Sequence, residues 1–192
     1  MPAVIGLLLL VVLRSACSDE KTDVGGPVTD AENTASMVME ISINRPQNAG
    51  RGYRRPYVAA WLADKDGFPV RTLLLWVQTS GPGPRWIPDL RQWYRDDRFR
   101  RLADDTNLVD AVSSPTRNVG TYKVAWDGND DHGKPLPAGK YTLFVEAARE
   151  HGTYQLIRKP LDLQAAAFEE DLAGNVEIRS VRISFRGLRS VR

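Results

Sequence analysis

Three oxygen-bearing side chains, Asp127, Asn129 and Asp131, are spaced two residues apart between two apolar runs. The same spacing places the first ligands of a calcium-binding loop, in which carboxylate and amide oxygens surround the ion. The pattern stops there, because His132 takes the place of the loop glycine and Ala138 that of the bidentate glutamate. A calcium ion bound without that glutamate would remain largely hydrated, so a metal site is the less favoured interpretation.

A tight turn explains more of this stretch than a metal site does. Aspartate and asparagine side chains accept hydrogen bonds from nearby backbone N–H groups, and glycine tolerates positive φ. We therefore predict that the stretch reverses the chain between two strands. The residues expected to hold the turn are Asp127, Gly128, Asp130, Gly133 and Gly139.

Two other segments carry side chains that could bind a ligand. In the first, Arg54, Arg55 and Tyr57 place two cations beside an aromatic ring, which suits an anionic group held by bidentate hydrogen bonds and stacking. The second segment is a predicted loop between two strands, a position at which binding residues are common. Its candidate side chains are Arg149, Glu150, His151 and Tyr154. The simpler interpretation of both segments is that these side chains face solvent or pair with neighbouring charges.

No stretch of the sequence matches a known catalytic motif. There is no strand-to-helix serine elbow, no phosphate-binding glycine loop and no HExxH pair. The single cysteine, Cys17, lies in the N-terminal segment, where it cannot serve as the nucleophile of a folded domain. We expect a protein that is not an enzyme and that needs no cofactor, although a tryptophan at the edge of the domain could stack on a flavin.

Residues 1–16 form a predicted signal peptide. The apolar run over residues 3–13 is shorter than the about 20 residues that a membrane-spanning helix needs. The small residues Ser15 and Ala16 then precede Cys17, as expected at a cleavage site for a signal peptidase. The segment therefore predicts export rather than a membrane-spanning anchor.

The position of Cys17 resembles the lipobox of bacterial lipoproteins, in which the cysteine is acylated after cleavage. This resemblance implies a lipid anchor at Cys17 and a polar tether over residues 17–35. Arg14 departs from the lipobox, which has an aliphatic residue at that place. The alternative is a secreted soluble protein with a free thiol.

Positive and negative charges are nearly balanced along the chain. The sequence has 26 Lys and Arg residues against 24 Asp and Glu residues, and residues 1–16 contribute only Arg14 to these totals. A nucleic-acid-binding protein would instead show a basic stripe that neutralises phosphates. The composition therefore argues against nucleic acid as a partner.

Alternation of apolar and polar residues predicts a series of strands. It is visible over residues 37–43, 57–63, 70–77, 121–126, 140–148, 154–163 and 176–185. The Asp64–Gly67 stretch predicts a hairpin turn, and a change of phase near Ser180 predicts a β-bulge. Apolar residues at helical spacing predict one amphipathic helix over residues 88–102.

These elements predict an all-β fold over residues 36–188. Short strands separated by turn residues are typical of an immunoglobulin-like or fibronectin-III-like antiparallel β-sandwich, here with about seven strands and one inserted helix. Alternating burial predicts a single core layer between the two sheets.

The turn also carries a sequence resemblance. WDGNDDHGKPLPAGKYT, residues 126–142, is similar to the turn signature of immunoglobulin-like domains such as that of the flagellar hook-capping protein. In that family the signature forms a hairpin between two strands. The resemblance implies a structural role for the acidic residues.

A second resemblance covers about two thirds of the chain, from about Met37 to Leu163. YRRPYVAAW at 53–61, RTLLLW at 71–76, RWIPDL at 85–90, the turn and EAAREHGTYQ at 146–155 follow one another in order. Together they resemble the periplasmic family called domain of unknown function 2271. The family has no assigned activity, and its members occur beside PepSY-type membrane proteins and an FMN transferase, which implies a periplasmic redox or metal-acquisition context.

From these observations we expect an exported, lipid-anchored lipoprotein of the periplasm that acts as a non-catalytic binding or assembly module. Its expected partners are the membrane, through Cys17, and another periplasmic or membrane protein, with a PepSY-type protein as one candidate. The alternative is an accessory factor for flavin, haem or metal, with a ligand site around Arg149 to Tyr154. A hydrolase is a third and less favoured alternative.

Overall fold

The computed structural model describes residues 34–47 and 52–188. The predicted signal peptide, Cys17 and nearly all of the predicted tether lie outside the described residues. Among the described residues, no helix combines the length and the apolarity that a bilayer-spanning segment needs.

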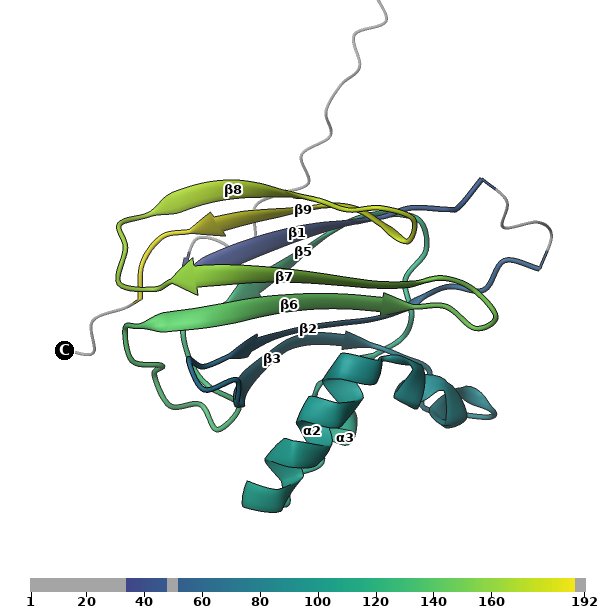
Figure 1. Ribbon diagram of the computed structural model, residues 1–192, viewed down its shortest axis with the longest axis horizontal. Coiled ribbons are helices and arrows are strands. Elements are labelled where there is room, and N and C mark those ends of the chain that lie inside the picture. The colour runs from purple at the N-terminus through teal and green to yellow at the C-terminus, as the bar shows by residue number, and fades with distance from the viewer. Residues whose placement is uncertain (1–33, 48–51, 189–192) are drawn as a thin grey trace, which may run out of the picture.

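Two β-sheets stack face to face to form a sandwich (Figure 1). The four-stranded sheet has the order β5 (Gly120–Trp126), β1 (Met37–Ile43), β9 (Ile178–Phe185), β8 (Phe168–Ala173). The five-stranded sheet has the order β4 (Ser113–Ser114), β3 (Pro69–Trp76), β2 (Tyr57–Ala63), β6 (Lys140–Ala148), β7 (Tyr154–Asp162). All pairs are antiparallel except β3 with the two-residue β4. The predicted all-β sandwich is confirmed, with nine strands in the described residues rather than about seven.

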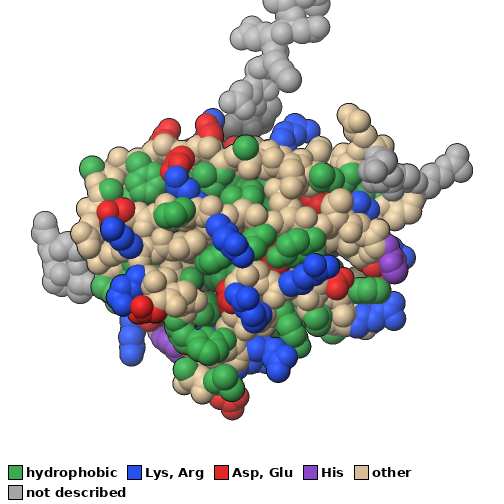
Figure 2. All heavy atoms as spheres, viewed as in Figure 1, with side chains coloured by type: hydrophobic (Ala, Val, Ile, Leu, Met, Phe, Trp, Pro, Cys, Tyr) green, Lys and Arg blue, Asp and Glu red, His purple; other side chains and the backbone are tan. Residues whose placement is uncertain are grey.

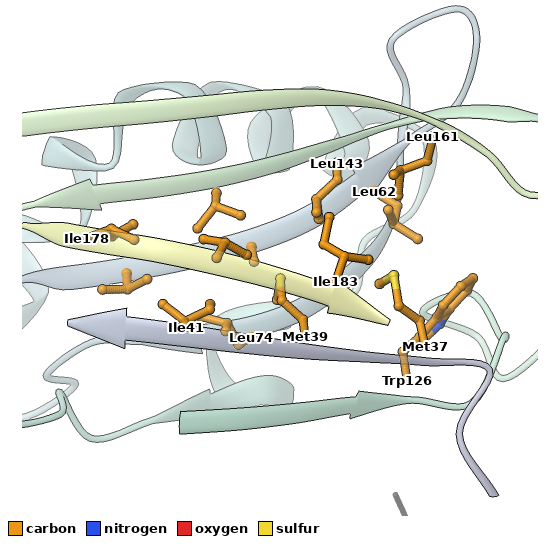
Figure 3. Close-up of a cluster of buried hydrophobic side chains, with 14 of the residues drawn as sticks. Met37, Met39, Ile41, Leu62, Leu74, Trp126, Leu143, Leu161, Ile178 and Ile183 are labelled. Carbon is orange, nitrogen blue, oxygen red and sulfur yellow. The ribbon is translucent and has the colours of Figure 1, made fainter. Parts of the chain in front are cut away.

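The main core lies between the two sheets and follows the predicted alternation. Along β1, the side chains of Met37, Met39, Ile41 and Ile43 are buried, while the residues between them are half-buried. Figure 3 shows side chains of β1 and β9 facing those of β2 and β6 across the sandwich. The period of two places every second side chain in this layer.

A second core covers the outer face of the five-stranded sheet, so the prediction of a single core layer was wrong. Strand β2 is buried at all seven positions. Val58, Ala60 and Leu62 face the main core, whereas Ala59 and Trp61 pack beneath the helices. A strand that is apolar on both faces can bury both only when another layer covers the second one.

The helical insertion between β3 and β5 supplies that layer. It consists of the 3₁₀ helix η1 (Gly83–Asp89), α2 (Arg91–Ala103) and the short α3 (Leu108–Val112). Ile87, Leu90 and Trp93 are its buried contacts with the sheet. The predicted helix over 88–102 thus corresponds mainly to α2, which begins three residues later because Pro88 lies in the preceding 3₁₀ turn.

Strand β8 was not predicted, while the predicted bulge on β9 is observed. On β8, the exposed Glu169 and Asp171 alternate with half-buried residues, and Glu170 interrupts the apolar face that Phe168 and Leu172 turn toward the core. Such charged edges hinder pairing with other chains. On β9, the partner of Ser42 is Ser180 but that of Ile43 is Ile178, which leaves one extra residue in the strand.

Candidate functional site

The acidic turn and the two predicted ligand segments lie at opposite ends of the sandwich (Figure 1). The turn follows β5 and precedes β6, beside the β2–β3 hairpin. The ligand segments flank the start of β2 and the hairpin between β6 and β7. The protein therefore has two separate candidate sites, one at each end of the sandwich.

In the acidic turn, Asp127 and Asn129 bond to each other. One carboxylate oxygen of Asp127 accepts the backbone N–H of Asn129 at 3.0 Å, and the other accepts the Asn129 amide at 2.7 Å. Burial by itself raises the pKa of the Asp127 carboxyl, but the hydrogen bonds from Asn129 outweigh it and the net shift is downward. The carboxylate form of Asp127 is thus held by its local neighbours.

Asp131 points instead toward β3. Its two carboxylate oxygens accept the backbone N–H of Thr72 at 2.9 and 3.1 Å, and its own N–H donates to the carbonyl of Val70 at 3.1 Å. Arg71 supports the same contact by donating to the carbonyl of Asp130 at 2.8 Å. Burial raises the pKa of the Asp131 carboxyl, with the Thr72 N–H and Arg71 opposing it. Asp131 therefore occupies the edge of β3 where a neighbouring strand would otherwise pair.

The remaining turn residues shape the backbone. Asp130 accepts the N–H groups of His132 and Lys134 at 2.9 and 2.8 Å. Gly128 has a φ of +95°, and a Cβ added there would lie 2.8 Å from the Ser36 hydroxyl, so the position requires glycine. Gly133 also has positive φ, whereas Gly139 does not.

The turn oxygens do not converge on a common centre. Asp127 and Asn129 are engaged with each other and Asp131 with β3. Within residues 34–47 and 52–188, no group of three or more His, Cys, Asp or Glu residues is arranged to hold a metal ion.

At the other end of the sandwich, a cleft of about 390 Å³ lies among the segment before β2, the η1 region and the β6–β7 hairpin. The predicted residues Arg54, Arg55, Tyr57 and Glu150 all line it. The structure thus joins one member of the second predicted segment to the first segment in a single site. We call this site the arginine cleft.

Three arginines and two acidic residues line the arginine cleft, namely Arg54, Arg55, Arg85, Asp89 and Glu150. Arg54 is 3.7 Å from Glu150, and its side chain is 69% exposed. Arg55 and Arg85 form no ion pair with any described residue. Two guanidinium groups are therefore available to an incoming anion.

Aromatic rings form the rest of the wall. The Tyr57 hydroxyl donates to the carbonyl of Gly83 at 2.9 Å, which fixes the ring against η1. The Arg85 guanidinium lies 4.7 Å from the centre of the Trp86 ring. Trp86 also meets the His151 imidazole edge to face, with the ring centres 5.5 Å apart. This ring contact connects the cleft to the β6–β7 hairpin.

His151 lies in an adjacent hollow of about 660 Å³ that shares Arg54 and Glu150 with the arginine cleft. Its backbone has a φ of +53°, an unusual conformation for a residue other than glycine, at the tip of the hairpin. The side chain is 82% exposed, with the imidazole nitrogen 3.7 Å from Glu150. His151 is therefore positioned at the edge of the cleft and open to solvent.

Arg149 is engaged in a buried ion pair. It donates to Glu177 at 2.7 Å, and the Thr153 hydroxyl is bonded to the same carboxylate oxygen. Glu177 is fully buried, and its other oxygen has no partner among the described residues. Gly152 leaves room for the arginine, because a Cβ at that position would lie 2.5 Å from the guanidinium carbon. The Tyr53 ring covers the same guanidinium at 5.7 Å.

Tyr154 does not join the cleft. Its hydroxyl contacts the buried carboxylate of Glu146. Burial of the phenol, and to a lesser extent this contact, raises the pKa of Tyr154. The Arg91 guanidinium covers its ring at 5.0 Å. Of the second predicted segment, Glu150 and His151 thus remain near the cleft, while Arg149 and Tyr154 are engaged in internal contacts.

The charged and aromatic residues of the arginine cleft that were not predicted as site residues are Tyr53, Arg85, Trp86 and Asp89. Tyr53 directly precedes the predicted Arg54 and Arg55, so sequence proximity was a usable signal. Arg85 and Trp86 directly follow a run of alternating glycines and prolines at residues 81–84 and combine an arginine with an aromatic residue, as the predicted segment Arg54 to Tyr57 does. Their distance from that segment along the chain concealed their closeness to it.

A second groove of about 400 Å³ continues from the arginine cleft and shares Arg55, Gln78 and Thr116 with it. Hydroxyl groups line this continuation, from Thr79, Ser80, Ser113 and Ser114.

Residues 38–180 of the chain, which include the cleft, match the family described as predicted periplasmic protein (DUF2271). No curated protein matches the chain. Because the match spans most of the sequence, the chain belongs to this family of predicted periplasmic proteins.

Proposed function

We propose that this protein is a non-catalytic binding module of the periplasm and that the arginine cleft holds its ligand, an anion with a flat unsaturated portion. The single observation that carries this proposal is the placement of Arg55 and Arg85, from distant parts of the chain, in one cleft without an ion-pair partner in the described residues. Export and a lipid anchor at Cys17 belong to the same proposal.

The charge of the cleft favours an anion. Three arginines face two acidic residues, and Arg54 is already close to Glu150. A guanidinium presents a planar set of N–H donors that matches a carboxylate or phosphate. Arg55 and Arg85 can therefore provide both charge and directed hydrogen bonds.

The aromatic wall favours a flat group next to the anion. Trp86 is half-buried, lines the cleft and contacts the side chains of His151 and Arg85. Rings of this kind stack on planar ligands and contribute about 0.5–1.5 kcal/mol beyond the burial of area. The guanidinium groups favour an anion and the aromatic ring favours a flat group. Together they favour a ligand that carries both, rather than any anion or any flat molecule.

Binding without catalysis fits the groups present. The imidazole beside the cleft, His151, is exposed, and its polar neighbour is the Glu150 carboxylate rather than a hydroxyl or thiol nucleophile. General-base activation of a nucleophile requires the two groups within hydrogen-bond reach. The described residues of the cleft offer no such pair.

A second candidate function is that of an accessory factor in a redox or metal-acquisition system. The Trp86–His151 contact favours it, because an exposed imidazole beside a tryptophan could contact a flavin or haem at the cleft mouth. A flavin or haem absorption band in protein purified from its native host would support this alternative. A PepSY-type membrane protein would then be a candidate partner.

Titration with FMN and riboflavin tests the main proposal. The two compounds share one flat ring system, and only FMN carries a phosphate. We expect calorimetry to show FMN binding at least about tenfold tighter, since hydrogen bonds to charged groups contribute about 1.5–3 kcal/mol. Arg55→Gln and Arg85→Gln should each reduce FMN affinity by about the same tenfold factor and leave riboflavin affinity unchanged.

Arg182→Gln is the matched control, because Arg182 is an exposed arginine on the four-stranded sheet that pairs with Asp171. This variant should bind FMN as the unchanged protein does. If FMN and riboflavin bind equally, or if Arg55→Gln and Arg85→Gln leave FMN affinity unchanged, the arginine cleft is not an anion site. Phenyl phosphate serves as a second, smaller probe. Its affinity should fall in the Arg55→Gln and Arg85→Gln variants and stay unchanged in Arg182→Gln.

A further inference from the structure

Helix α2 presents an exposed face that mixes arginines with large apolar side chains. Its members are Arg91, Tyr94, Arg95, Arg98, Phe99 and Leu102, which together line a shallow groove of about 350 Å³. We call it the α2 outer face. Residues three and four apart lie on one side of a helix, so all six side chains point the same way.

The apolar side chains of the α2 outer face are unusually open to water. Phe99 is 59% exposed and Leu102 is 84% exposed. Phe99 has one ring contact, with Phe68 of the β2–β3 hairpin at 5.9 Å. Figure 2 shows hydrophobic and Lys or Arg side chains side by side over this helix. Contiguous exposed apolar surface of this kind marks an interaction site.

The acidic residues of α2 are turned away from this face. Asp97 is buried and pairs with Arg100 and Arg101, each at 2.8 Å. Asp96 is also buried and accepts bonds from Gln92 at 3.0 Å, while Arg95 reaches it from the exposed side at 3.2 Å. The outward charge of the helix is consequently positive, with Arg98 lacking an ion pair among the described residues.

We propose that the α2 outer face docks on a membrane surface that contains anionic phospholipid. The arginines match the charge of such a surface, and their long side chains can extend to the headgroups while Phe99 and Leu102 enter the boundary of the acyl chains. The side chains stand on an exposed helix rather than inside a deep groove, which suits a broad lipid surface better than a single peptide. The periplasm in which the family is predicted to reside is bounded by membranes.

This proposal does not depend on the arginine cleft or on acylation of Cys17. Its test is therefore made with the mature chain from Cys17, produced without an acyl group. Flotation with vesicles of phosphatidylglycerol and phosphatidylcholine is compared with flotation with vesicles of phosphatidylcholine alone. We expect binding to the anionic vesicles, weaker binding to the neutral ones, and release as the salt concentration rises.

Two pairs of substitutions separate charge from apolar contact. Arg91→Gln with Arg98→Gln should weaken binding roughly fivefold for each arginine. Phe99→Ser with Leu102→Ser should weaken it by about tenfold or more. All four positions are exposed, so the thermal unfolding midpoint provides a check that the fold is retained.

Arg182→Gln and Val119→Ser are the matched controls. Arg182 is an exposed arginine outside α2, and Val119 is an exposed apolar residue, at 47%, just before β5. Both should bind vesicles as the unchanged chain does. The proposal is overturned if no vesicles are bound, if both lipid compositions bind equally, or if the controls lose as much binding as the α2 variants.

Two other occupants of the α2 outer face would give different results. If the face joins two copies of the chain, sedimentation would show a concentration-dependent dimer that Leu102→Ser abolishes, without vesicle binding. If it binds an acidic peptide, poly-glutamate would bind in the same α2-dependent manner while anionic vesicles would not. Either result overturns membrane docking.

Discussion

The two carboxylate oxygens of Asp131 accept the backbone N–H of Thr72, at 2.9 and 3.1 Å. Asp131 belongs to the acidic turn between β5 and β6, whereas Thr72 lies on β3, 59 residues earlier. The Thr72 N–H lies at the edge of the five-stranded sheet, where a neighbouring strand would normally accept its hydrogen bond. The Asp131 side chain accepts that bond in place of a strand. Unpaired edge groups invite association with other chains, so the turn protects this edge.

Asp131→Ala should destabilise the protein. Thr72 is buried, and loss of the carboxylate leaves its N–H unpaired at a cost of about 1–3 kcal/mol in the free energy of unfolding. Urea denaturation measures this change. Asp127→Ala is the control in the same turn and should cost less, because Asp127 is exposed and its carboxylate bonds only to Asn129 of the turn. Equal losses would show that Asp131 has no special role at the edge of β3.

Calcium should leave the acidic turn unchanged. The oxygens of Asp127 and Asp131 are engaged with different groups, Asn129 and Thr72 respectively, and do not surround a common point. We therefore expect the thermal unfolding midpoint to be the same with calcium and with a chelator. A calcium-dependent rise that Asp127→Ala removes would contradict this prediction and restore the metal interpretation of the turn.

The buried Glu146 should give stability a distinct pH dependence. Its carboxylate on β6 accepts the N–H groups of Gln92 and Trp93 at the start of α2, at 2.9 and 2.7 Å. Burial nevertheless raises the pKa of Glu146 above its ordinary value of 4.5. The unfolded chain then loses this proton at a lower pH than the folded protein does. The contribution to stability is complete below pH 4.5 and is lost as the pH rises through the folded-state pKa.

Comparison with Glu146→Gln isolates that contribution, since glutamine does not titrate. The free energy of unfolding of the unchanged protein minus that of the variant should fall as the pH rises from acidic to neutral. Parallel pH profiles, or a difference that grows with pH, would show that burial does not raise the Glu146 pKa. Denaturant titrations at several pH values provide the measurement.

Arg149→Ala should be among the more damaging single substitutions. Its guanidinium is the charge partner of the fully buried Glu177, and removing one member of a buried pair costs about 3–5 kcal/mol. Arg149→Ala combined with Glu177→Gln should recover part of this loss, because no buried charge then remains unpaired.

Arg54→Ala is the control for the buried pair. Arg54 is mostly exposed and lies 3.7 Å from Glu150, so its loss should change the free energy of unfolding by less than about 1 kcal/mol. A double-mutant cycle from denaturant titrations compares the two pairs. A coupling energy near zero between Arg149 and Glu177 would contradict the structural role given to them.

The elements that sequence patterns predicted well are those set by local chemistry. Alternation along β1 and β6 identified their buried faces, and the Asp64 to Gly67 stretch identified the hairpin between β2 and β3. Strand β8 escaped prediction because three of its six residues are acidic and Glu170 interrupts its apolar face between Phe168 and Leu172. The second core was missed although β2 is apolar at all seven positions, a pattern that indicates a strand covered on both faces.

The candidate site was predicted only in part. Arg54, Arg55 and Tyr57 were recognisable because they are neighbours in sequence, and the structure adds Arg85 and Trp86 from beyond β3. No sequence pattern could indicate that Arg149 faces Glu177, 28 residues away. Partners that lie far apart along the chain become neighbours only when the sheets pair and stack.

By itself, the sequence determined the strand periods, the amphipathic helix, the reversing turn and the family of the chain, because each depends on short-range spacing or on motifs in order. Tertiary structure alone decided which face of the sheet α2 covers, which arginines remain without an acidic partner, and that Asp131 completes the edge of β3. The physical reason is that backbone geometry is local, whereas burial and ion pairing depend on contacts between segments far apart in sequence.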